Sequence, residues 1–131
     1  MATEPEPVIE FVDVHKTFGK QKVLNGLSMS IPKGQVTSVI GRSGTGKSVT
    51  LKHIMGLIKP DEGQILFDGS DVVRMREREL YQMRKRFGFL FQDSALFDSM
   101  SVFENVAFPL REHTKKRKAE IQDIVRAKLK V

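Results

Sequence analysis

Apolar and polar residues alternate along the first part of the chain in the manner of strands that expose one face to solvent. Residues 8–14 and 27–31 show this alternation, and the short apolar pair Val23-Leu24 lies between them. Polar segments that contain glycine or proline, at 16–20 and 32–34, separate these runs as turns. The pattern predicts two or three antiparallel strands.

Three further apolar runs also predict strands. Residues 36–40 are short and rich in β-branched side chains, and residues 87–91 form a nearly continuous apolar run, which favours strands buried in a parallel sheet. Residues 64–67 return as a strand that ends at an Asp68-Gly69 turn.

Helical spacing accounts for most of the remaining chain. It predicts helices over 49–57 and 77–86, and a turn followed by a short helix over 97–108. A last helix is expected after an N-cap at Thr114, with an apolar stripe made of Ile121, Ile124, Val125 and Leu129. Strands and helices together predict an α/β fold.

Composition excludes several classes of protein. The chain has 131 residues, of which 40% are hydrophobic and 29% charged, as expected for one compact globular domain at most. No apolar run is long enough for a membrane span, and the acidic start, residues 1–7, predicts a disordered leader rather than a signal peptide, so we expect a cytoplasmic protein. The absence of cysteine excludes disulfides and thiolate metal sites.

The formal net charge of +6 is concentrated in two basic clusters, at 74–86 and 111–130. Such clusters can contact nucleic acid or anionic headgroups. A base-stacking platform would need several aromatic residues interleaved with these charges, and only Tyr81 lies within the two clusters, so we interpret both as solvated helical faces and expect no nucleic-acid partner.

The candidate chemistry lies in the sequence GRSGTGKS, which matches the phosphate-binding pattern G-x-x-x-x-G-K-[ST] between a predicted strand and a predicted helix. Glycine tolerates the positive φ angles and the close phosphate approach that such a loop requires. The lysine can reach the β- and γ-phosphates, and the final serine can ligate Mg²⁺. The residues predicted to bind nucleotide phosphate are Gly41, Ser43, Gly44, Thr45, Gly46, Lys47, Ser48 and Val49.

The order of these segments resembles the ATP-binding subunit of ABC transporters, through nearly the whole chain from Val8. Residues 14–19 are similar to its adenine-stacking loop, residues 57–65 to the run that follows its phosphate loop, and Phe91-Gln92 to its Q-loop. The resemblance implies a P-loop NTPase fold of the ABC ATPase type, with an N-terminal antiparallel β-subdomain, and implies ATP and Mg²⁺ as cofactors.

A narrower resemblance is to the Mla-type ATPase subunits, which energise phospholipid trafficking between the two membranes of Gram-negative bacteria. It implies a peripheral position on the inner face of the inner membrane. The segments that carry it are Leu80-Tyr81, Arg84-Lys85-Arg86, Leu90-Phe91-Gln92, Ala95-Leu96-Phe97, Met100, Val102-Phe103, Asn105-Val106-Ala107 and residues 109–114.

The family resemblance also implies roles for single residues. Phe18 would stack on adenine, although the residues alone favour a core phenylalanine. Lys47 and Gln92 would be catalytic, with Gln92 meeting Mg²⁺ and the attacking water. Two subunits would sandwich two nucleotides as a head-to-tail homodimer. A permease's coupling helix would be received by the apolar set Phe97, Met100, Val102 and Phe103. His15, His53 and His113 lack metal-ligand spacing, so we expect them to be structural or exposed.

The sequence also departs from the family pattern. It stops roughly 100 residues before a full ATPase domain would, and it lacks the signature segment, the Walker B aspartate, the water-polarising glutamate and the switch histidine. We therefore expect an incomplete core sheet, and nucleotide binding without hydrolysis by these residues alone. Two alternatives stay open: a non-transport ABC ATPase that acts on nucleic acid or ribosomes, and a nucleotide-responsive binding module without catalysis.

Overall fold

The computed structural model describes residues 6–92 and 95–130, and the chain forms two compact units rather than the single one that its length suggests. The first unit runs to Arg84 and the second begins at Lys85. Most of the predicted leader, residues 1–5, lies outside the described residues, but Pro7 is already paired with Pro32 in the first strand.

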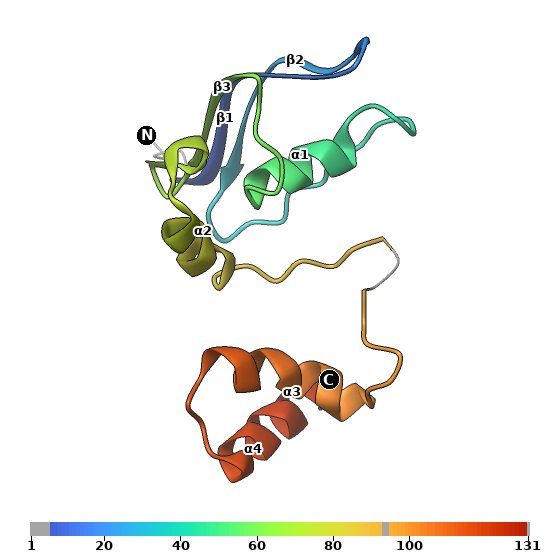
Figure 1. Ribbon diagram of the computed structural model, residues 1–131, viewed down its shortest axis with the longest axis vertical. Helices are drawn as coiled ribbons and strands as arrows, with labels where there is room; N and C mark the ends of the chain where they lie inside the picture. The colour runs from blue at the N-terminus through green and yellow to red at the C-terminus, as the bar shows by residue number, and fades with distance from the viewer. Residues whose placement is uncertain (1–5, 93–94, 131) are drawn as a thin grey trace. The chain divides into compact units, whose positions relative to one another are not determined.

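The first unit contains an antiparallel sheet of four strands (Figure 1). Its strands are β1 (Pro7–Phe18), β2 (Gln21–Pro32), β3 (Glu62–Phe67) and β4 (Ser70–Asp71), in the order β2-β1-β3-β4. Every neighbouring pair is antiparallel, which confirms the predicted N-terminal β-subdomain.

The hairpin between β1 and β2 is tighter than predicted. Residues 16–18, expected in a turn, continue β1, and Phe18 pairs with Gln21 across a turn of only Gly19 and Lys20. Two-residue hairpins need positive φ angles in the turn, and Gly19 supplies one at 59°. The tight turn therefore places Phe18 as the last residue of β1.

Helices pack beside this sheet. Helix α1 (Lys47–Ile54) contacts β3, and the short helix η1 (Val72–Arg74) and helix α2 (Glu77–Arg84) follow the sheet (Figure 1). Arg84 donates hydrogen bonds to Met55 O at 3.0 Å and Gly56 O at 3.1 Å, just beyond the last turn of α1. The buried apolar side chains of this unit are Ile9, Phe11, Val14, Leu24, Ile54, Ile65, Phe67, Val72, Leu80 and Met83.

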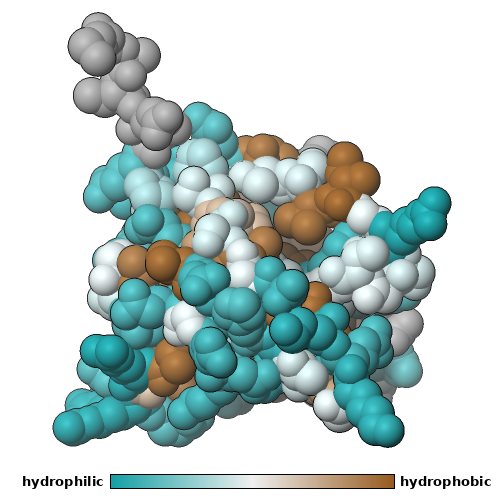
Figure 2. Space-filling model, turned by 90° about the horizontal axis from the view of Figure 1, so that it is seen from above, coloured by the Kyte–Doolittle hydropathy of each residue, from teal (hydrophilic) through white to brown (hydrophobic). Residues whose placement is uncertain are grey.

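The two strands predicted for a parallel sheet are wrong as strands. Residues 36–40 and 87–91 have no regular secondary structure, and the side chains of Val36 and Ile40 are 97% and 93% exposed. A strand is stable only beside a neighbour that pairs with its backbone, and no ladder of the described residues includes either segment. Figure 2 shows hydrophobic surface among hydrophilic residues.

The second unit is a pair of helices, α3 (Val102–His113) and α4 (Lys118–Leu129). Its core is small and consists of Ala107, Ile121 and Val125, against which Phe103, Val106 and Leu110 pack. None of the helices in the described part of the chain is long and apolar enough to cross a bilayer.

The ends of these helices differ from the prediction. Thr114, expected to be the N-cap of the last helix, is the C-cap of α3, and Arg117 is the N-cap of α4. The strongest cap lies at the start of α3, where Ser101 and Glu104 form a reciprocal capping box. Ser101 and Glu104 satisfy backbone N–H groups at the start of α3, whereas Thr114 lies at the opposite end of that helix.

Candidate phosphate-binding site

In the loop that precedes α1, two of the three glycines have the positive φ angles that the sequence predicted, and Gly41 does not. Gly44 and Gly46 have φ angles of 79° and 95°. Gly46 is also the N-cap of α1, and a Cβ atom there would lie 3.2 Å from Val23 O. Glycine is therefore required at Gly46 both by its φ angle and by the proximity of β2.

Lys47 folds back over this loop. Its Nζ donates hydrogen bonds to Gly41 O and Arg42 O, each at 2.6 Å. Arg42 O also accepts from the Thr45 hydroxyl at 2.8 Å, so the loop closes on itself around the ammonium group. The structure thus holds a cation inside the turn where the sequence predicted phosphate binding.

Besides the Lys47 ammonium group, the start of α1 supplies backbone N–H donors. The first N–H groups of a helix have no intrahelical partner and carry the positive end of the helix dipole. Ser43 and Ser48 are exposed in the loop and the first turn, and Val49 is half-buried. This arrangement is suited to an anion such as a phosphate group.

A cavity of about 370 Å³ lies beside the loop. Loop residues, including Lys47, form one part of its wall, and Leu24, Leu27 and Met29 of β2 form another. This volume falls within the range of small-molecule sites, which combine mostly apolar walls with a few polar groups.

Phe18 is not a core residue, contrary to what the residues alone favoured. Its side chain is 46% exposed at the end of β1, and Lys16 Nζ lies 5.4 Å from the ring centroid. An exposed aromatic ring next to a cation is available to a planar ligand.

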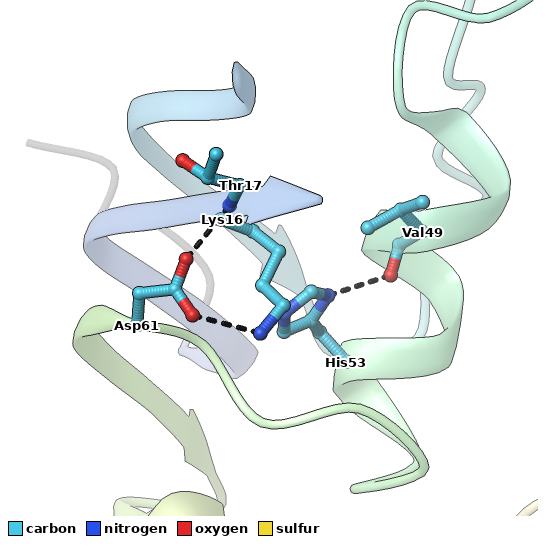
Figure 3. A network of polar contacts seen from close by, with 5 residues as sticks. All are labelled: Lys16, Thr17, Val49, His53 and Asp61. Carbon is cyan, nitrogen blue, oxygen red and sulfur yellow. Dashed lines mark hydrogen bonds and ion pairs between the residues drawn. The ribbon is translucent and has the colours of Figure 1, made fainter. Parts of the chain in front are cut away.

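A polar network that the sequence did not predict connects Asp61 with Lys16 and Thr17 near the end of β1 (Figure 3). The Asp61 carboxylate accepts from Lys16 Nζ at 2.8 Å and from Thr17 N at 2.7 Å. The bond from Lys16, and then that from Thr17, lowers the pKa of Asp61. In the sequence, the Pro60-Asp61 pair marks a turn, but it does not tell which backbone amide donates to the Asp61 carboxylate.

His53 is the buried member of the same region. It is 0% exposed, and its Nδ1 lies 2.7 Å from Val49 O, so Nδ1 carries the proton and donates. Nε2 has no hydrogen-bond partner within the described residues. Burial lowers the pKa of His53, the bond to Val49 opposes that shift, and the charge of Lys16 adds to it. His53 is therefore a buried residue of the first unit, and its structural role stays a prediction.

The remaining predicted site residues belong to the second unit. Gln92 is exposed and precedes residues 93–94, which lie outside the described part. Of the apolar set, Phe97 and Val102 are exposed, while Met100 and Phe103 are half-buried.

Asn105 shapes the segment that carries this set, a function that the sequence did not reveal. Its Oδ1 accepts from Phe97 N at 2.9 Å, and its Nδ2 donates to Phe97 O and Met100 O, each at 3.2 Å. One side chain on α3 therefore fixes the backbone of the loop before the helix.

No cluster of three or more carboxylate or histidine side chains suited to a metal ion occurs in residues 6–92 and 95–130. His15 Nε2 instead lies 3.1 Å from Asp13 Oδ1, next to it on β1.

Comparisons with known proteins identify relatives of this chain. The "Probable ribonucleotide transport ATP-binding protein mkl" of Mycobacterium leprae is 50% identical over 123 residues, which are 94% of this chain and 35% of that protein. The "Intermembrane phospholipid transport system ATP-binding protein MlaF" of Haemophilus influenzae is 48% identical over 111 residues, which are 85% of this chain and 42% of that protein. The chain thus spans about a third to two fifths of the length of these relatives.

A solved structure also matches, a dimeric post-hydrolysis state of the ATP-binding cassette MJ0796 bound to ADP and Pi. Its TM-score is 0.79 at 28% identity, over 89% of this chain and 53% of that chain. Residues 24–130 match the ABC transporter family, and this range includes the whole phosphate loop. The chain therefore belongs to the ABC transporter family.

Proposed function

We propose that this chain binds ATP with Mg²⁺ as the ATP-binding subunit of an ABC transporter, and that the whole protein couples ATP binding and hydrolysis to lipid transport by a membrane permease. The observation that carries the proposal is the ammonium group of Lys47, held by Gly41 O and Arg42 O at the N-terminus of α1. Phosphate oxygens would exchange with these two carbonyls as partners of Lys47.

The described residues fit a magnesium nucleotide. Lys47 and the N–H groups at the start of α1 would bind the β- and γ-phosphates, together with Gly41, Ser43, Gly44, Thr45, Gly46 and Val49. Ser48 offers a hard hydroxyl oxygen, the kind of ligand that Mg²⁺ prefers. When bound, Mg²⁺ would neutralise charge on the phosphates. Phe18 would stack on the adenine.

Hydrolysis needs more than this site. Phosphoryl transfer requires a residue that orients water and a metal held from a second side. Gln92 is proposed for part of this work, and the other residues are proposed to lie in the part of the relatives that this chain does not span. A second copy, arranged head to tail, would complete each site with its signature segment. The solved relative is described as dimeric, which supports this arrangement.

The cargo is proposed to be a phospholipid. The names of the two similar proteins differ, one referring to ribonucleotide transport and the other to intermembrane phospholipid transport. The Mla-type segments in and around the second unit, including the exposed Phe97 and Val102 proposed to receive a coupling helix, favour the lipid.

Reconstitution of the full-length protein with its permease in vesicles tests this proposal. Phospholipid is expected to stimulate ATP hydrolysis, and ATP is expected to drive movement of a fluorescent phospholipid. Stimulation by ribonucleotides, with no effect of phospholipid, would reject the lipid assignment but retain the transporter. Stimulation by nucleic acid that falls steeply with salt would favour a non-transport ATPase instead.

A further inference from the structure

One carboxylate holds the end of β1 in place. Asp61, in the loop before β3, accepts hydrogen bonds from Lys16 Nζ at 2.8 Å and Thr17 N at 2.7 Å (Figure 3). Its own backbone N–H donates to His15 O at 2.9 Å. Three consecutive residues of β1 are therefore fixed by Asp61, and the next residue along the strand is Phe18.

These bonds begin where regular pairing stops. The described ladder between β1 and β3 ends at the pair formed by His15 and Glu62. Beyond it, β1 continues to Phe18 with a neighbouring strand only on the β2 side, within the described residues. Beyond the end of the ladder, Asp61 Oδ2 thus accepts from the Thr17 amide, and Oδ1 holds the Lys16 side chain.

The same carboxylate sets the environment of the Phe18 ring. Lys16 Nζ, bound by Asp61, lies 5.4 Å from the ring centroid, and the Lys16 side chain is only 16% exposed. Phe18 itself is 46% exposed. Lys16 therefore occupies one side of the ring, and solvent can reach the rest of it.

We propose that Asp61 is a positioning residue for Phe18, which holds Lys16 and the Thr17 amide so that the phenylalanine ring can stack on a purine base. The inference rests on the proposed binding of ATP. It assigns Asp61 an effect on recognition of the base, through Phe18, and no contact with the phosphates. If Asp61 were only a turn residue that supports the fold, its loss would weaken base-containing and base-free ligands alike.

The test compares magnesium complexes of ATP and of inorganic triphosphate by calorimetry in the full-length protein. Phe18→Ala is expected to weaken ATP about 5- to 150-fold, the range for one stacked base, and to leave triphosphate unchanged. Asp61→Ala is expected to weaken ATP by about threefold or more, and triphosphate by less than about twofold. In the Phe18→Ala background, Asp61→Ala should have no further effect on ATP, because the ring that it positions is gone.

Two other variants provide the controls. Glu62→Ala removes the neighbouring exposed carboxylate and is expected to leave the affinities of both ligands unchanged. Asp61→Asn keeps an acceptor for Thr17 N but loses the charge that holds Lys16, so its ATP affinity should fall between those of wild type and Asp61→Ala. If Asp61→Ala shows no cooperative unfolding transition and is therefore not folded, the ratio of ATP affinity to triphosphate affinity in Asp61→Asn decides the question.

The outcomes separate the inference from the function on which it rests. Equal losses of ATP and triphosphate in Phe18→Ala would reject base stacking by Phe18, whatever Asp61 does. A selective loss of ATP in Phe18→Ala, with no effect or a non-selective loss in the Asp61 variants, would overturn the positioning role and leave the proposed function intact. Additive losses of ATP in the double variant would also overturn it.

Discussion

Two apolar segments of the first unit have similar composition but opposite structures. Strand β1 carries Ile9, Phe11 and Val14 into the core, where Phe11 is 2% exposed and Val14 is 0% exposed. Residues 36–40 are even richer in β-branched side chains, yet Ile40 is 93% exposed and the segment belongs to no strand. Intrinsic strand propensity therefore does not decide which segment becomes a strand.

The difference lies in the distance along the chain to a pairing partner. β1 meets β2 through a two-residue turn, so an antiparallel neighbour is supplied locally. A parallel neighbour is reached only through a crossover connection of a dozen residues or more. Closing such a loop costs chain entropy, so the pairing depends on residues far away in the sequence. We propose that the partners of residues 36–40 lie in the part of the relatives that this chain does not span.

Alanine substitutions measure this contrast directly. In the 131-residue chain, Phe11→Ala should lower the free energy of unfolding by about 3–5 kcal/mol, because it leaves a cavity in a packed core. Ile40→Ala should change it by less than about 0.5 kcal/mol, as for other exposed positions. Urea unfolding of both variants gives the two values.

The same pair becomes more informative in the full-length protein. If residues 36–40 form a buried strand there, Ile40→Ala should cost about 2–5 kcal/mol, as other buried isoleucines do. A small cost in both chains would show that this segment is not a core strand. A large cost in the 131-residue chain would show that Ile40 is already buried in solution, for example against a second copy.

The phosphate loop directly follows residues 36–40, and its Gly46 lies against β2, the strand that pairs with β1. Lys47→Ala in the full-length protein should weaken a fluorescent ATP analogue by roughly two orders of magnitude, since hydrogen bonds to charged groups contribute about 1.5–3 kcal/mol each. Lys52→Ala, an exposed lysine on the same helix, is the matched control and should leave binding unchanged. Equal affinities of the two variants would contradict the phosphate role of Lys47.

The sequence predicted the fold where local rules determine it. The strand 64–67 and the Asp68-Gly69 turn are confirmed, and both turn residues have positive φ angles. The helix predicted over 77–86 is present as α2 over Glu77–Arg84. Residues 36–40 and 87–91 could not be predicted correctly, because an apolar run does not tell whether a pairing strand is present.

The site shows the same division between local and distant information. The glycines and Lys47 take their positions from a loop and a helix start that are contiguous in sequence, and the structure places them together. The contact of Asp61 with Thr17 spans 44 positions, so no periodicity or motif could reveal it. The exposure of Phe18 likewise depends on the hairpin length and on Lys16 beside the ring.

The smallest expected effect concerns the second unit, whose small core makes helix ends important. Ser101→Ala should lower the stability of α3 by about 1 kcal/mol, the usual cost of losing an N-cap, measured as faster amide exchange at Asn105 N. Hydrogen bonds from the Ser101 amide and then its hydroxyl lower the pKa of Glu104 from its ordinary value of 4.5. A lowered pKa in the folded state means that the contribution of Glu104 to stability is present above about pH 4.5 and is lost as the pH falls through the folded-state value.

Glu104→Gln should therefore flatten the acid dependence of α3. In the wild type, protection of Asn105 N should decrease as the pH falls below about 4.5, beyond the intrinsic pH dependence of exchange, whereas in the variant this extra decrease should be absent. Glu112→Gln removes a carboxylate near the other end of the same helix and should retain the wild-type profile. An unchanged acid profile in Glu104→Gln would show that the capping box does not control the stability of this end of α3.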